Sequence, residues 1–274
     1  DVYKRQVMKR IIFSFYIRTD DSNVDKFEKH FDKLLDTQAD YADSIGVPYI
    51  FYNNDWQYKE FAKQFESRPE ISQYNIINFY KIHLMYELSK YYDEILYLDL
   101  DVIPFTNDNF FDVWNFKNAI TIYNTNNLVN RRTGISSLRH GIRSPSAKYY
   151  NAQAMLINKG LSPLNDVFNT GIVGITKDQL KELDYFTNFD NTLEFMKELH
   201  NDELYPKNVR EMFGYDNETL FSYKVKLNNC KIQWLDEKWH YFFDKQGFIP
   251  KETKFVHAIN KDFDTVWRFY DRYR

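Results

Sequence analysis

The fold is decided by a stretch that reads EILYLDLDVIP, residues 94–104. Residues Ile95–Leu98 form an apolar run that is too short for a helix, so they predict a buried β-strand. Because side chains alternate along a strand, Asp99 and Asp101 are expected to point the same way where this strand ends. Two carboxylates so arranged repel each other unless a divalent cation, a phosphate-bound metal or a shared proton relieves the charge. The alternative is that the Asp-x-Asp pair caps a turn.

The residues before this stretch alternate between strand and helix patterns. We predict strands over residues 10–17 and 47–52, and helices over residues 24–45, 56–65 and 74–91. Crossovers of this length allow the strands to pair in parallel. An open parallel sheet binds its ligands beyond the carboxyl ends of its strands, and Asp99 and Asp101 are expected at such an end.

The residues after the Asp-x-Asp pair are less regular. We predict strands over 119–123, 167–176, 230–235 and 254–258, helices over 148–158, 177–183 and 192–199, and a packed terminal helix within 267–274. No repeat or flexible linker interrupts the chain, which favours a single α/β domain over residues 8–274. Residues 1–7 precede Met8 and are interpreted as a non-native leader.

A long loop is expected over residues 124–145, inside a segment, 113–165, that contains no Asp or Glu. That segment is basic, with Lys117, Arg131, Arg132, Arg139, His140, Arg143, Lys148 and Lys159. Long loops inside compact domains are often functional. The loop is therefore a candidate receptor for an anion, such as a phosphate of a donor or acceptor, and a solvated face is the equal alternative.

The composition excludes several classes of protein. The 274 residues carry 36 basic and 39 acidic side chains, so no global charge points to nucleic acid. The single cysteine, Cys230, rules out an intrachain disulfide. No apolar window is long enough for a transmembrane helix and no signal-peptide pattern is present, so the expected location is cytoplasmic.

Four motifs follow one another in a recognisable order: LDLD at 98–101, FNTGIV at 168–173, YDNETL at 215–220 and FVHAINK at 255–261. Together they resemble the nucleotide-sugar glycosyltransferases of the GT-A class, and most closely glycosyltransferase family 8, the glycogenin-like and lipopolysaccharide galactosyltransferase-like group. The resemblance covers residues 9–262. It implies a GT-A (Rossmann-like) fold with a mostly parallel central sheet flanked by helices. It also implies a nucleotide-binding half, 9–112, and an acceptor-side half, 113–274.

The resemblance implies a metal site. Asp101 would be a direct ligand, Asp99 would bind the metal or the ribose, and His257 matches the family's late metal-binding histidine. Carboxylate oxygens suit Mg²⁺ or Mn²⁺, and an imidazole favours Mn²⁺. A hydrogen-bonded structural histidine is the alternative for His257.

The resemblance also implies residues that bind the donor. Lys261 is the candidate phosphate clamp, although the chain has Asn260 at the family's glycine and its lysine two positions early, so the basic loop could supply the cation instead. Lys81 would lie near the donor and contact the nucleotide or pair with Asp99. Tyr16 matches the region that contacts the base, and a buried core tyrosine is the alternative.

Three further residues are candidates for the transfer itself. Asn169 matches a residue near the donor sugar. Asp216 and Glu218 match the family's paired acids, which would orient sugar hydroxyls or the acceptor. In an inverting reaction either acid could serve as the general base, and in a retaining reaction it would stabilise an oxocarbenium-like state. Asp216 could equally be a helix N-cap. Trp239 and His240 fall in the family's acceptor-side region.

The function expected from these motifs is metal-dependent transfer of a hexose from a nucleotide-diphosphate sugar to a carbohydrate or other acceptor hydroxyl. Two alternatives remain open: a non-catalytic sugar-binding protein, and a phosphatase of the haloacid-dehalogenase type, whose nucleophile also lies in an Asp-x-Asp after an apolar strand. Neither nucleic acid nor a transmembrane segment is expected as part of this function.

Overall fold

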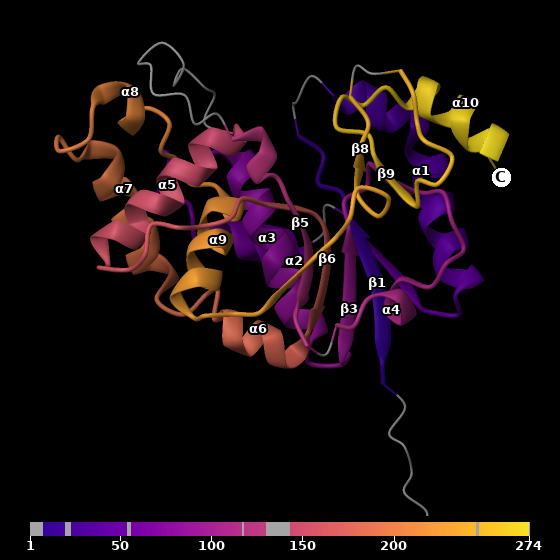
Figure 1. Ribbon diagram of the computed structural model, residues 1–274, viewed down its shortest axis with the longest axis horizontal. Coiled ribbons are helices and arrows are strands. Elements are labelled where there is room, and N and C mark those ends of the chain that lie inside the picture. The colour runs from indigo at the N-terminus through magenta and orange to yellow at the C-terminus, as the bar shows by residue number, and fades with distance from the viewer. Residues whose placement is uncertain are drawn as a thin grey trace, which may run out of the picture.

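The computed structural model of the protein describes residues 8–19, 23–53, 56–116, 118–129, 143–244 and 247–273. Its centre is a six-stranded sheet in the order β2-β1-β3-β6-β5-β7 (Figure 1). The strands are β1 (Arg10–Phe15), β2 (Tyr49–Tyr52), β3 (Glu94–Leu98), β5 (Ile120–Asn124), β6 (Phe168–Thr176) and β7 (Ile232–Trp234).

Most of this sheet is parallel, as expected. Strand β1 pairs in parallel with β2 and β3, and β5 pairs in parallel with β7. Strand β6 lies between β3 and β5 and is antiparallel to both, which the sequence did not predict. In this pairing Leu98 lies opposite Ile172, so the end of β3 meets the middle of β6.

A smaller sheet in the order β4-β9-β8 stands beside the first. It consists of β4 (Val102–Pro104), β9 (Phe255–His257) and β8 (Tyr241–Phe242). Val102 lies opposite His257 in the antiparallel β4–β9 ladder, and the Ala258 amide donates to the Asp101 carbonyl at 2.9 Å. This ladder brings the last strand of the chain next to the Asp-x-Asp pair.

Helices cover both faces of the central sheet (Figure 1). They are α1 (Val24–Ser44), α2 (Trp56–Lys63), α3 (Gln73–Leu88), α4 (Phe110–Val113), α5 (Pro145–Asn158), α6 (Lys177–Leu183), α7 (Phe189–Asn201), α8 (Lys207–Arg210), α9 (Asn217–Leu227) and α10 (Phe263–Tyr273), with a 3₁₀ turn at Asn126–Leu128. Alternate side chains of β1 enter different cores: Ile11 and Phe13 pack with α3, α5 and α9, whereas Ile12 packs with α1. No described helix combines the length and the apolar character that a membrane span needs.

Most predicted elements are present, with ends shifted by a few residues. The largest shift is in α10, which begins at Phe263 rather than residue 267, and β7 is limited to Ile232–Trp234. Residues 1–7 and the centre of the predicted basic loop, 130–142, lie outside the described residues. Residues 99–101 form a tight turn between β3 and β4, so both aspartates extend into the cavity from this turn and not from the strand itself.

Candidate active site

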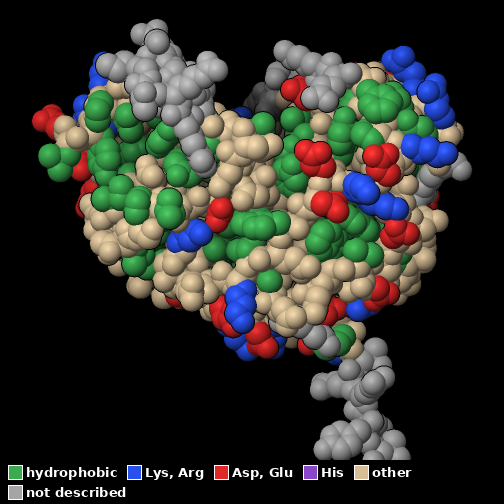
Figure 2. Space-filling view, viewed as in Figure 1, with side chains coloured by type: hydrophobic (Ala, Val, Ile, Leu, Met, Phe, Trp, Pro, Cys, Tyr) green, Lys and Arg blue, Asp and Glu red, His purple; other side chains and the backbone are tan. Residues whose placement is uncertain are grey.

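A cavity of about 780 Å³ opens at the carboxyl ends of β1 and β3. The space-filling view has a hollow at the top edge of the molecule, between the side that carries α5 and the side that carries α1 and α10 (Figure 2). The lining includes eight of the nine predicted site residues: Tyr16, Lys81, Asp99, Asp101, Asn169, Glu218, His257 and Lys261.

The turn that carries the two aspartates is fixed by its backbone. The Asp99 amide donates to the Gly171 carbonyl of β6 at 2.8 Å. Gln38 of α1, which is fully buried, donates its side-chain amide to the carbonyls of Asp99 and Val102 at 2.9 and 2.8 Å. Because these backbone groups are satisfied inside the fold, the two carboxylates keep fixed directions.

Asp99, Asp101 and His257 form a candidate metal centre. Each offers a ligand atom, and these atoms all lie within 4.8 Å of one another. His257 Nε2 is 3.4 Å from Asp101 Oδ2 and 3.9 Å from Asp99 Oδ2. Burial alone would raise the pKa of Asp101, but Lys261 and His257 beside it hold that pKa well below its ordinary value. Asp101 is therefore an ionised carboxylate at neutral pH.

These residues fit a hard divalent cation. Two carboxylates and one neutral imidazole are the ligand types that Mn²⁺ and Mg²⁺ sites use. Space for the imidazole depends on Gly171, since a Cβ there would lie 2.5 Å from His257 Cε1. The Lys261 ammonium contacts Asp101 Oδ2, and Lys261 also lines the cavity.

His240 supports His257 from behind. It is fully buried, and its Nε2 lies 3.0 Å from His257 Nδ1. Burial and the neighbouring His257 hold the pKa of His240 well below its ordinary value, so its ring is neutral. For His257 Nε2 to bind a metal through its lone pair, Nδ1 must carry the proton and donate it to His240 Nε2. His240 Nδ1 has no hydrogen-bond partner among the described residues.

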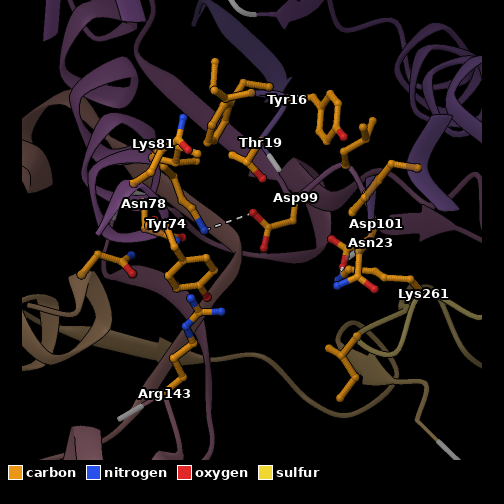
Figure 3. Close-up of a pocket in the computed structure, with 18 of the residues that line it drawn as sticks. Tyr16, Thr19, Asn23, Tyr74, Asn78, Lys81, Asp99, Asp101, Arg143 and Lys261 are labelled. Carbon is orange, nitrogen blue, oxygen red and sulfur yellow. Dashed lines mark hydrogen bonds and ion pairs between the residues drawn. The ribbon is translucent and has the colours of Figure 1, made fainter. Parts of the chain in front are cut away.

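The Asp99 carboxylate is held by contacts with Lys81 and Tyr97. It is also more exposed than the carboxylate of Asp101. Lys81 of α3 is buried and contacts Asp99 Oδ1 at 3.1 Å (Figure 3). The Tyr97 hydroxyl donates to the same oxygen, whereas Oδ2 points towards His257. Lys81 also donates to the carbonyl and hydroxyl of Thr170, each at 3.2 Å. Asp99 is 27% exposed and Asp101 only 6%, so Asp101 is the more enclosed of the two ligands.

The acids at the start of α9 form a second buried cluster. Asp216 caps the helix, because its carboxylate accepts from the amides of Glu218 and Thr219 at 2.9 and 3.1 Å. Glu218 accepts from the Thr170 amide at 2.7 Å and from the ammonium of Lys148. Burial opposes ionisation of Glu218, but Lys148 and these hydrogen bonds keep its pKa below its ordinary value. Burial raises the pKa of Asp216, against the lowering effect of Lys148.

Comparison with known proteins identifies the architecture. Mouse xyloside xylosyltransferase 1, in its apo form, superposes with a TM-score of 0.53 at 11% identity, over 93% of this chain and 99% of that one. The chain has the GT-A fold. Two further structures match with lower scores. The galactosyltransferase LgtC, in complex with donor and acceptor sugar analogues, matches with a TM-score of 0.48 at 12% identity, over 91% of this chain and 87% of that one. A glycosyltransferase involved in glycosylation of the major capsid of PBCV-1 matches with a TM-score of 0.45 at 13% identity, over 94% of this chain and 99% of that one. No protein-family model and no curated protein matches the sequence.

The GT-A fold explains how the four motifs converge. The Asp-x-Asp turn, the start of β6, the start of α9 and the end of β9 all reach the same cavity. Asn169 lines it, and its side-chain oxygen accepts from the Gly171 amide at 3.0 Å. Tyr16 also lines it, packed at 5.2 Å against the ring of Phe27. The GT-A fold differs from the fold that a phosphatase of the haloacid-dehalogenase type would require.

Some candidates lie away from the cavity and some lining residues were missed. Asp216 is not among the lining residues, and Trp239 and His240 are buried residues outside the lining. Asn217, which lies between Asp216 and Glu218 in the sequence, lines the cavity and donates to Thr170 Oγ1 at 3.1 Å. Tyr74 was missed because its place at the start of α3 carries no motif. Only the tertiary fold reveals these positions.

Proposed function

We propose that this protein is a metal-dependent glycosyltransferase that moves a hexose from a nucleotide-diphosphate sugar to an acceptor hydroxyl. The observation that carries the proposal is the cluster of Asp99, Asp101 and His257 on the wall of a cavity of about 780 Å³. A cavity of this size suits a ligand larger than a single sugar. The GT-A fold, shared with a protein named as a xylosyltransferase, supports the same chemistry.

In this proposal Asp101 and His257 bind the metal directly and Asp99 is its third ligand. Bound Mn²⁺ or Mg²⁺ supplies charge neutralisation for the leaving nucleoside diphosphate. Lys261 turns from Asp101 to a phosphate oxygen, as a point charge on a flexible stem. Lys81 stays on Asp99 and keeps that carboxylate oriented, because it is buried and already bonded to Thr170.

In this proposal the buried acids at the start of α9 act on the acceptor side of the reaction. Glu218 lines the cavity and remains ionised, so we assign it the orientation of sugar or acceptor hydroxyls. Asp216 fixes the start of α9 and thereby the position of Glu218. Asn169 contributes a side-chain amide to the same wall. Tyr16 offers its ring to the nucleotide base at the end of β1.

The proposal is tested by thermal unfolding of the protein with a panel of nucleotide-sugars, with and without Mn²⁺, together with an assay for released nucleoside diphosphate. A ligand that binds only the folded state raises the Tm, so the donor should raise it only when Mn²⁺ is present. Asp101→Asn should abolish both the shift and the release. Asp178→Asn, an exposed acid on α6, is the matched control.

Two results would contradict the proposal in different ways. Donor turnover that persists in a chelator removes the metal from the mechanism. A metal-dependent Tm shift with no turnover in the presence of any hydroxyl acceptor favours the non-catalytic sugar-binding protein.

A further inference from the structure

Three of the basic side chains that line the cavity each contact a carboxylate. Lys81 contacts Asp99, Lys148 contacts Glu218, and Lys261 contacts Asp101. Arg143 lines the same cavity, and within the described part of the chain no carboxylate lies in contact with its guanidinium. Among the described residues, Arg143 is thus a basic side chain of the lining that has no carboxylate in contact.

The undescribed residues next to Arg143 cannot supply the missing carboxylate. The whole segment from 113 to 165 contains no Asp or Glu. Residues 130–142 instead add Arg131, Arg132 and Arg139, three further positive charges directly before Arg143 in the sequence. The segment itself therefore contains no carboxylate that could pair with Arg143.

Arg143 is held in position by an aromatic ring. Its Cζ lies 3.6 Å from the centre of the Tyr74 ring, a stacked cation–π contact (Figure 3). Burial raises the pKa of Tyr74 to about 12, so its phenol is neutral at pH 7 and does not balance the guanidinium. Stacking uses the face of the guanidinium and leaves its N–H edges for a ligand. Those edges match a carboxylate or a phosphate in a bidentate contact.

This cation is separate from the metal centre. Tyr74 belongs to α3 and Arg143 immediately precedes the N-cap of α5, whereas Asp101 and Lys261 lie across the cavity from them (Figure 3). A diphosphate bound at the metal centre would be neutralised there by the metal and Lys261. Arg143 then remains available for a second anion in the same complex.

We propose that the carbohydrate substrate of this cavity carries an anionic group, a carboxylate or a phosphate, that binds Arg143. This inference rests on the proposed function, because it names the class of sugar that the transferase uses. The anionic group belongs either to the transferred sugar or to the acceptor. Both sources share one chemistry, bidentate acceptance of hydrogen bonds from the guanidinium edge.

The test compares matched acidic and neutral probes by calorimetric binding to the full chain. In the acceptor arm the probes are methyl β-D-glucuronide against methyl β-D-glucoside, and glucose 6-phosphate against glucose. In the donor arm they are UDP-glucuronate against UDP-glucose, with Mn²⁺. A charge-assisted contact predicts that the acidic member of at least one pair binds about tenfold or more tightly. The arm in which this preference occurs identifies the source of the anion.

Three variants distinguish a specific contact with Arg143 from a non-specific effect of positive charge on the protein. Arg143→Gln should remove the preference, and Arg143→Lys should keep only part of it, because an ammonium cannot make the bidentate contact. Arg268→Gln, on α10 outside the cavity, should leave it unchanged. The inference is overturned if the wild type binds acidic and neutral probes equally, or if Arg143→Gln keeps the full preference.

The acceptor arm is measured without metal, so the anion contact at Arg143 and the metal-dependent transferase can fail independently. If UDP-glucose and other donors bind with Mn²⁺ but no probe pair shows an acidic preference, only this inference fails. If an acidic preference at Arg143 persists while no donor binds with Mn²⁺, the acidic site stands and the metal-dependent transferase fails.

Discussion

His257 lies so close to Gly171 that a single added carbon on the glycine would come within 2.5 Å of the imidazole Cε1 and 2.8 Å of its Nδ1. Gly171 is in strand β6 and its own carbonyl accepts from the Asp99 amide, whereas His257 ends strand β9. The glycine of the Asn-Thr-Gly motif is therefore explained by the space that a candidate metal ligand occupies, and it needs no unusual backbone angle.

Gly171→Ala should displace His257 and weaken Mn²⁺ binding on the order of tenfold or more, as expected for a disturbed ligand position. The matched control is Gly174→Ala in the same strand, where a Cβ would lie 2.5 Å from the Phe116 ring. Overpacking should cost each variant about 1–3 kcal/mol of unfolding free energy. Mn²⁺ titration followed by electron paramagnetic resonance distinguishes them. Equal Mn²⁺ affinities in the two variants would disprove the link between Gly171 and the metal.

His240→Phe should weaken Mn²⁺ binding by about 10- to 100-fold, because the hydrogen bond that fixes the His257 tautomer is lost. His240→Gln can still accept that hydrogen bond and should retain part of the affinity. His83→Phe, a histidine of α3 packed on Phe61 outside the cavity, is the control for the loss of a ring nitrogen. If the loss of Mn²⁺ affinity in each variant were proportional to its loss of Tm, His240 would act only through packing and not through its hydrogen bond to His257.

Lys148→Met should destabilise the protein by about 3–5 kcal/mol, since it leaves the buried Asp216 and Glu218 without their cation. Adding Glu218→Gln to this variant should restore much of the loss, because one uncompensated charge is removed. Urea unfolding of the single and double variants measures both effects. Two additive losses would mean that Lys148 and Glu218 do not interact.

Cys230 should react slowly with iodoacetamide in the native protein. Burial raises the pKa of its thiol to about 11, and only the thiolate is alkylated. At pH 8 the thiolate fraction should be about a hundredfold lower than for an ordinary cysteine, and labelling should accelerate about tenfold per pH unit up to pH 10. Labelling in urea gives the unperturbed rate. A native rate equal to the rate in urea would contradict the raised pKa.

The sequence predicted the strand-helix order up to β3 because each element there shows one clear hydrophobic period. It also predicted that Asp99 and Asp101 lie at the ligand-binding edge of the sheet. The antiparallel direction of β6 was not predictable, because strand direction depends on the long connection before it. The contact between Asp101 and His257 was anticipated from the motif order, and the β4–β9 ladder that produces it depends on tertiary pairing.

The supporting residues were harder to predict than the ligands. His240 shares no motif with His257, and its role follows only from its place behind that ring. Asp216 was expected as an N-cap or a catalytic acid, and the structure contains the cap. Its chemical role stays a prediction. Arg143 belonged to a basic segment in the sequence, but its stacking on Tyr74 requires two distant segments to meet.

The β4–β9 ladder also has a consequence for synthesis. Asp99 and Asp101 leave the ribosome long before His257, so a growing chain has both carboxylates and no imidazole to complete the set. A metal that used all three residues as ligands could therefore bind with full affinity only after β9 has paired with β4. Under the proposed function, metal binding would then report that the smaller sheet has formed.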